Sequence, residues 1–205
     1  MTKFTAEVMN REMLDVIQRM ASLAEYREPD IQSHLERVRG YCSVIARGLG
    51  LETQDVEIIS YASQLHDIGE ICIPDSVLQK SGKLTPYEWD LVKRHPIVGA
   101  EILKGAPSVI LQAGEIIALT HHERWDGSGY PYRRKGEAIP LSGRICALAD
   151  IFDALTTKRP YKDEISVDEA FQLILDNDGI LFDPGLVKVF IENFDEICKV
   201  RQTNL

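Results

Sequence analysis

Two adjacent histidines followed by a turn-rich loop are the residues with the clearest potential for chemistry. His121 and His122 end an apolar run typical of a helix, and two glycines and a proline fall within the last five residues of segment 123–131. Neighbouring side chains on a helix point about 100° apart, so we expect the two imidazoles to reach different ions of a multi-metal cluster. The glycines and Pro131 predict a compact loop that presents Tyr130 beside the metals.

Acidic residues near other histidines complete the expected cluster. His66 and Asp67 are adjacent at a predicted helix end, where they can offer a nitrogen and an oxygen to a pair of metals. Asp30 and His34 are four residues apart, so they are expected to project from one helix face as a ligand pair. Asp150 lies within an apolar segment, where a carboxylate is costly unless it is paired or bound to a cation.

A further aspartate accompanies this set. Asp153 follows Asp150 by three residues and faces the same way to within about 60° on a helix. It is either a second metal ligand or a hydrogen-bond acceptor that orients a ligand, and we favour the acceptor. Histidine nitrogens together with carboxylate oxygens suit iron or manganese, with zinc or nickel as alternatives.

The elements that must position these residues are predicted to be helices. Capping boxes at Thr85–Glu88 and Ser166–Glu169 mark strong helix starts, and Pro96 is expected to end a helix at His95. No stretch alternates with a period of two, so we expect an all-α, single-domain bundle of roughly eight to ten helices. The expected helices cover 4–27, 30–49, 53–65, 85–95, 96–104, 107–122, 144–157, a segment from 166, and 183–197.

Composition limits the classes of partner. The chain has 205 residues, 44% hydrophobic and 27% charged, as in an ordinary globular protein, and its net charge of −9 argues against duplex nucleic acid as a partner. No apolar run approaches the roughly 20 residues that span a bilayer, and no signal-peptide pattern is present, so we expect a cytoplasmic protein without membrane contact. Cys42, Cys72, Cys146 and Cys198 are far apart in apolar surroundings and are expected to be buried, reduced thiols.

An ordered series of short motifs resembles the HD-GYP branch of the HD superfamily of metal-dependent phosphohydrolases. His66-Asp67 is similar to the superfamily signature, and segment 121–131 is similar to the HHExxDGxGYP motif of the branch. The resemblance extends over 28–195 and implies an all-α fold that hydrolyses the bacterial messenger cyclic di-GMP to pGpG, in some members on to GMP. The other matching segments are 73–75, 95–96, 149–155, 159–162 and 182–184.

The resemblance also implies roles for individual side chains. His66 and Asp67 are the implied catalytic pair, and Tyr130, Arg159 and Lys162 the implied substrate-binding residues, with the two cations on the phosphates. Two divalent metal ions, or three, would lower the pKa of a bridging water so that hydroxide attacks phosphorus. The implied metal ligands, which include all five histidines of the chain, are Asp30, His34, His66, Asp67, His95, His121, His122 and Asp150.

Two residues depart from the family pattern. Asp30 stands where the family usually has glutamate. Because its side chain is shorter, both a two-metal and a three-metal site stay open. Glu70 stands where the family commonly has lysine, which reverses a charge near an anionic substrate. Glu70 either points away from the substrate, acts as a protonated acid, or changes the choice of substrate or the rate.

Three functions are therefore weighed for the chain. The preferred one is a cyclic di-GMP phosphodiesterase, with cyclic GMP-AMP as another substrate because of Glu70. The alternative is a degenerate module that binds a cyclic dinucleotide or a partner protein without turnover. A general phosphohydrolase for nucleoside phosphates is disfavoured by the GYP loop. Residues 1–27 are expected to form an amphipathic coupling helix for a homodimer or a sensory or receiver module, with 28–205 as the HD-GYP domain.

Overall fold

Helices account for the regular structure throughout the described chain. The computed structural model describes residues 3–27, 30–158 and 163–204, with side chains from residue 11 onward. Within these ranges there is no strand, only an isolated bridge between Asp178 and Phe182. The all-α prediction is confirmed.

The bounds of the elements follow in chain order. The α helices are α1 (Lys3–Ala24), α2 (Ile31–Gly48), α3 (Thr53–Ser63), α4 (Asp75–Leu78), α5 (Pro86–Val92), α6 (His95–Leu103), α7 (Val109–Thr120), α8 (Leu141–Thr156), α9 (Val167–Asp176), α10 (Pro184–Glu192) and α11 (Phe194–Thr203). Two 3-10 turns accompany them, namely η1 (Ile68–Cys72) and η2 (Gly136–Ala138).

Capping chemistry explains where several helices begin. Both predicted capping boxes are present, with Thr85 starting α5 and Ser166 starting α9. The prediction that a helix ends at His95 was wrong: α5 ends at Val92, and His95 is the first residue of α6 with Pro96 in its first turn. Proline fits a first turn because the amide it lacks has no intrahelical partner there.

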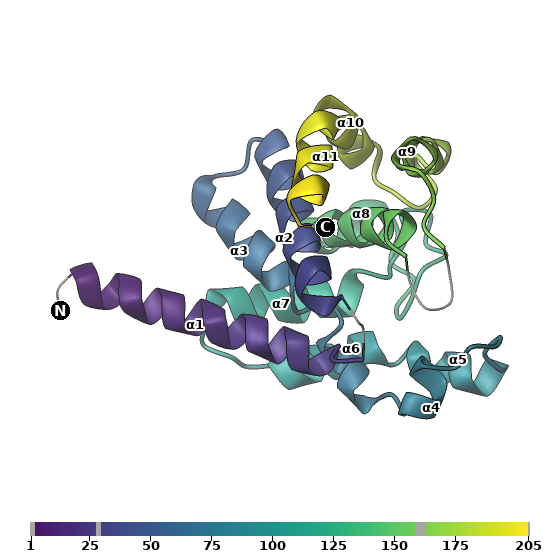
Figure 1. The fold of residues 1–205 in the computed structure, drawn as a ribbon, viewed down its shortest axis with the longest axis horizontal. Helices are drawn as coiled ribbons and strands as arrows, with labels where there is room; N and C mark the ends of the chain where they lie inside the picture. Colours follow the sequence, from purple (N-terminus) through teal and green to yellow (C-terminus); the bar gives the residue numbers. More distant parts are fainter. Residues whose placement is uncertain (1–2, 28–29, 159–162, 205) are drawn as a thin grey trace.

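The core is organised around α2. This helix packs against α3, α8, α10 and α11, while α6 packs against α7 and η1 (Figure 1). Tyr41 of α2 and Phe152 of α8 are wholly buried and meet edge to face with ring centroids 5.3 Å apart. Buried polar side chains also lie among these apolar residues, including His34, His66, His95, His121 and Asp153.

Helix α1 joins this core mainly through the buried side chains of its C-terminal half. Ile17, Ala21 and Ala24 are at most 1% exposed, and α1 contacts α2 and η1. The N-terminal half projects beyond the remaining helices (Figure 1). Val16 and Leu23 are 53% and 63% exposed, so α1 also carries uncovered apolar side chains.

The cysteines differ in part from expectation. All four are free thiols, and Cys42 and Cys146 are buried as predicted. Cys72 is exposed and Cys198 is half-buried, because each lies in a short element that presents one side to solvent. In the described part of the chain, no helix is both long enough and apolar enough to cross a membrane.

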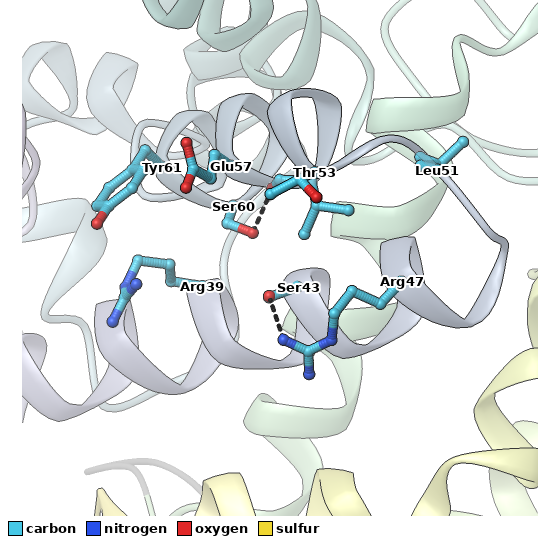
Figure 2. Close-up of a pocket in the computed structure, with 9 residues that line it drawn as sticks. Arg39, Ser43, Arg47, Leu51, Thr53, Glu57, Ser60 and Tyr61 are labelled. Atoms are coloured by element: carbon cyan, nitrogen blue, oxygen red, sulfur yellow. Dashed lines mark hydrogen bonds between the residues drawn. The ribbon is translucent and has the colours of Figure 1, made fainter.

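A polar cleft of about 320 Å³ lies between α2 and α3 (Figure 2). Its two arginines are already engaged: Arg39 pairs with Glu36, and Arg47 pairs with Glu196. None of the predicted site residues lines it. The lining residues are Arg39, Ser43, Arg47, Leu51, Thr53, Val56, Glu57, Ser60 and Tyr61.

Candidate metal centre

Three histidine rings share one hydrogen-bonding arrangement. In His66, His95 and His121, ring atom Nδ1 bonds to a backbone carbonyl three residues earlier in the chain. A carbonyl only accepts, so Nδ1 carries the proton and Nε2 keeps a lone pair. This is the tautomer that metal-ligating histidines commonly adopt. The acceptors are Ser63 (2.9 Å), Val92 (2.7 Å) and Ala118 (3.0 Å).

Asp67 lies where these Nε2 atoms converge. Its Oδ1 is 3.1 Å from Nε2 of both His95 and His121, and its Oδ2 is 3.4 Å from Nε2 of His66. Burial opposes ionisation of Asp67, but the imidazoles of His66 and His95 hold the pKa of its carboxyl well below the usual value. The centre therefore offers a negative charge among nitrogen lone pairs.

The candidate ligands form two groups in which all donor atoms lie within 4.8 Å of one another. The first group contains Asp67, His95, His121 and His122, and the second contains Glu25, His34 and His66. Asp150 lies nearby, with its Oδ1 3.7 Å from Nε2 of His66. The structure thus brings together seven of the eight predicted ligands and adds Glu25, which sequence reasoning missed.

The adjacent histidines lie close together. His121 and His122 fall in the same group, and their ring centroids are only 4.0 Å apart. Helix α7 ends at Thr120, so His121 is its C-cap and His122 lies in the following turn. The 100° rotation between neighbours on a regular helix does not apply beyond the last helical residue, which is why the two rings lie so close; their binding of different ions stays a prediction.

Burial sets the protonation of the rings. It lowers the pKa of His66 and holds that of His122 well below the usual value, so both are neutral near pH 7. Burial acts in the same direction on His121, but the hydrogen bond to Asp67 outweighs it and raises the pKa of that ring. The charge of Asp67 that favours a proton on His121 equally favours a bound cation.

A chain of buried polar contacts positions His34. Its Nδ1 is 2.8 Å from Oδ2 of Asp153. The same carboxylate accepts two hydrogen bonds from Arg37, at Oδ1 from Nε (2.6 Å) and at Oδ2 from Nη2 (3.1 Å). These contacts agree with the preferred interpretation of Asp153 as a hydrogen-bond acceptor for a histidine ring; the metal ligation by His34 stays a prediction. Arg37 is 1% exposed and was not anticipated from the sequence.

Asp30 and Asp150 are the two predicted ligands that fall in neither group. Asp150 still approaches His66, whereas Asp30 pairs with Arg37. The Asp30 side chain is 58% exposed and its Oδ2 accepts from Nη1 of Arg37 at 3.1 Å. Asp30 is the N-cap of α2, with φ −116° and ψ 35°, so it does not follow the helical path on which the four-residue spacing relies. The side chain is consequently directed at Arg37.

One buried carboxylate shapes the loop after the histidines. Glu123 is 3% exposed and accepts from the backbone amides of Tyr132 (2.8 Å) and Arg134 (3.0 Å). Gly129 lies against the backbone of residues 122–124, where a β carbon would overlap main-chain atoms. The loop is compact as predicted, although the role of Glu123 was not foreseen.

This loop places an aromatic wall beside the first ligand group. The Tyr130 ring stacks on His122, with centroids 4.7 Å apart and planes at 26°. Burial raises the pKa of its phenol, which therefore stays protonated as a donor. Trp89 of α5, 45% exposed, meets Tyr130 edge to face at 6.5 Å and is another residue that the sequence did not single out.

Two predicted residues lie outside the described part of the chain. These are Arg159 and Lys162, the expected phosphate-binding cations. Glu70 lies in η1 and is half-buried, with its backbone oxygen accepting from Nη1 of Arg27 at 3.3 Å.

The donor set fits divalent transition metals. It combines imidazole nitrogens with carboxylates, the ligands that iron, manganese and zinc accept in proteins. Nε2 of His66 is buried without a hydrogen-bond partner, as expected for an atom whose partner is a cation. Two ligand groups suit more than one ion, because Asp67 of the first group lies 3.4 Å from Nε2 of His66 in the second, and Asp150 lies 3.7 Å from the same nitrogen.

The sequence of this chain is similar to that of several known phosphodiesterases. A family model described as HD domain matches residues 18–186. The response regulator RpfG of Xanthomonas campestris, named a cyclic di-GMP phosphodiesterase, is 46% identical over 94% of this chain and 51% of its own length. A cyclic di-GMP phosphodiesterase of Thermotoga maritima is 45% identical over 92% and 51%, respectively. The 3'3'-cGAMP-specific phosphodiesterase 2 of Vibrio cholerae is 41% identical over 91% and 36%. The chain spans about half or less of the length of these relatives.

Solved structures share the fold. A cyclic GMP-AMP specific phosphodiesterase of V. cholerae (V-cGAP3) superposes with a TM-score of 0.64 and 23% identity over 94% of this chain and 52% of that chain. Bd1817 of Bdellovibrio bacteriovorus, an HDG"Y"P protein, gives 0.59 and 19% over 80% and 53%. At these identities the likeness concerns the helical fold.

Proposed function

Because the chain belongs to the HD domain family, in its HD-GYP branch, we propose that it is a metal-dependent phosphodiesterase that hydrolyses cyclic di-GMP to pGpG, and on to GMP. The observation that supports this most is the convergence of Nε2 lone pairs on Asp67. Histidines that served only packing would have no reason to direct three acceptor atoms at one carboxylate. A phosphodiester is a substrate that such a centre can activate.

The side chains have distinct tasks in this proposal. Bound metal ions supply an activated water and neutralise charge on the phosphate. His95, His121 and His122 hold one side of the centre, while His66 and Asp67, the catalytic pair, join it to the second group. Carbonyl acceptors fix the rings of His66, His95 and His121, so these ligands do not need to reorganise when substrate binds.

Recognition of the nucleotide is assigned to aromatic and cationic residues. Tyr130 and Trp89 present aromatic surface next to His122, where a guanine base can stack. Arg159 and Lys162 are proposed to bind the phosphates, which an acidic protein must attract through local cations. Cyclic GMP-AMP is the second candidate substrate, supported by the relative in V. cholerae that is named for it.

The metal complement is proposed as two divalent ions with a third as an extension. Iron and manganese are preferred because imidazole and carboxylate donors are mixed, with zinc and nickel as alternatives. Asp30 is not counted as a ligand in this proposal, since it pairs with Arg37.

The test is direct product analysis. Protein loaded with Fe(II) or Mn(II) under anaerobic conditions is incubated with cyclic di-GMP and with cyclic GMP-AMP, and products are separated by chromatography. The double variant His66→Ala, Asp67→Ala serves as the control. Formation of pGpG or GMP that is lost in the control supports the enzyme, and absence of product from metal-loaded protein would refute it.

A module that binds nucleotide or a partner protein without turnover remains the second candidate. The observation in its favour is the pairing of Asp30 with Arg37, which removes an expected ligand from the centre. Glu70, in place of a lysine, is the other departure. Binding of cyclic di-GMP by metal-loaded protein without any product would select this reading.

Restoring the family's charge at position 70 distinguishes the two functions. If the glutamate repels the substrate phosphates, Glu70→Lys is expected to raise kcat/KM for cyclic di-GMP by about tenfold, the effect of roughly 1.4 kcal/mol. Steady-state kinetics at two salt concentrations measure it, because a phosphate contact weakens as salt rises. Glu57→Lys, on the exposed surface of α3, is the matched charge reversal and should change little. An unchanged rate in Glu70→Lys would show that Glu70 does not limit turnover.

Regulation is proposed to arrive through residues 1–27, with 28–205 as the catalytic domain. The exposed apolar side chains Val16 and Leu23 on α1 suit a homodimer partner or a sensory or receiver module. A cytoplasmic location is proposed, because cyclic dinucleotide messengers act there.

A further inference from the structure

We infer that Glu25 is a ligand of a second metal position, together with His34 and His66, and that it brings helix α1 into the metal centre. The inference rests on the proposed function, which requires bound metal. It assigns to Glu25 the part that the sequence resemblance gave to Asp30. It also makes the docking of α1 a determinant of how many ions the centre holds.

The geometry around Glu25 is that of a ligand. Its side chain is 3% exposed, and its Oε2 lies 3.8 Å from Nε2 of His34. Nδ1 of His34 bonds to Asp153 and Nδ1 of His66 bonds to Ser63, so both Nε2 atoms have lone pairs to offer. A separation of 3.8 Å is too long for a hydrogen bond. It is close to the spacing of about 3–3.5 Å between two atoms that bind one ion at ligand distances near 2.1 Å.

Asp30 is placed for a different task. It contacts Arg37 rather than His34, and more than half of its side chain is in solvent. Arg37 is itself held by Asp153, the residue that orients His34. Asp30 thus stabilises the arginine behind the centre, while the carboxylate nearest to Nε2 of His34 comes from α1.

The position of Glu25 depends on how α1 is docked. Before it, Ala21 and Ala24 are buried against the core, and after it Arg27 binds Oδ1 of Asp75 at 2.6 Å and the backbone oxygen of Glu70 at 3.3 Å. Glu25 therefore sits between two anchors, at the end of a helix whose other half projects from the bundle (Figure 1). A displacement of α1 withdraws Glu25 from His34 and leaves the first ligand group intact.

Metal counting tests the assignment. Wild type, Glu25→Gln and the matched control Asp30→Asn are loaded with Mn(II), freed of excess metal and measured by mass spectrometry of the metal. Glu25→Gln keeps the size of the side chain but loses its charge, so it is expected to bind one equivalent less than wild type. Asp30→Asn is expected to keep the full number. Equal metal content in wild type and Glu25→Gln, or loss of an equivalent in Asp30→Asn, would overturn the inference.

A second readout can be made on wild type alone, with Glu25→Gln as the comparison. Hydrogen exchange of residues 17–25 in wild type is expected to slow when Mn(II) is added, because the ion ties α1 to α2, and Glu25→Gln should lose this protection. No effect of Mn(II) on α1 in wild type would contradict the inference even if Glu25→Gln failed to fold. Both experiments omit substrate. If wild type binds no metal, the proposed function fails as well. If wild type hydrolyses cyclic di-GMP in the product analysis described above while Glu25→Gln keeps its full metal content, only this inference fails.

Discussion

Asn in place of Asp67 is expected to remove both the first metal ion and the hydrolysis of cyclic di-GMP. Asp67 is the one carboxylate within 3.4 Å of three imidazoles in the described chain, and its charge balances whatever cation those rings bind. Loss of an outer-shell partner typically costs about 10–100-fold, so loss of this ligand should exceed about 100-fold in kcat/KM. Steady-state kinetics and metal analysis of the purified variant measure the two effects.

Asp55→Asn is the matched control for this change. Asp55 lies on the exposed surface of α3, and its neutralisation should leave metal content and rate unchanged. Asparagine has nearly the same shape as aspartate, so Asp67→Asn is expected to fold. Retention of full activity by Asp67→Asn would remove the central ligand from the proposed mechanism.

The second large effect concerns stability. Asp153→Ala leaves Arg37, which is 1% exposed, without its main counter-charge, and breaking a buried pair in this way typically costs about 3–5 kcal/mol. The free energy of unfolding is measured by urea denaturation of metal-free protein. The same variant should also weaken metal binding, since the Nδ1 partner that fixes the ring of His34 is lost.

An exposed ion pair provides the comparison. Glu196→Ala removes the partner of Arg47, but both side chains are about half exposed, so the cost should stay below about 1 kcal/mol. Combining Asp153→Ala with Arg37→Met should recover part of the lost stability, because the uncompensated charge is removed with its partner. Equal costs for Asp153→Ala and Glu196→Ala would show that the buried network does not stabilise the fold.

The prediction that the five histidines lie close together agrees with the structure for a physical reason. Histidine is uncommon in this chain, and each one stands beside a helix end or a carboxylate, so few arrangements satisfy all of them. The geometry differs from the expected one where the prediction extended a regular helix past a helix end. His122 follows the C-cap of α7 and Asp30 is the N-cap of α2, so neither obeys the angular spacing of a regular helix.

Other residues were missed because only tertiary packing defines their role. Glu25 follows the last turn of an amphipathic helix, where an acidic side chain is normally solvated, and it is buried only because α1 meets α2 and η1. Arg37 and Trp89 likewise acquire their partners from segments distant in sequence. Their local sequence contains no signal of these contacts, whereas capping boxes are local and were predicted correctly.

The network behind His34 has a consequence for how the protein is made. Asp153 pairs with His34 across 119 positions of the chain, and Arg37 also donates to the backbone oxygen of Asn204 at 3.0 Å, across 167 positions. Contacts of such long range form late in folding. During synthesis, Asp153 can therefore contact His34 only after α8 has left the ribosome. Arg37 can bond to Asn204 only after α11 has followed. The proposed metal position at His34 is consequently completed only after almost the entire domain has been translated.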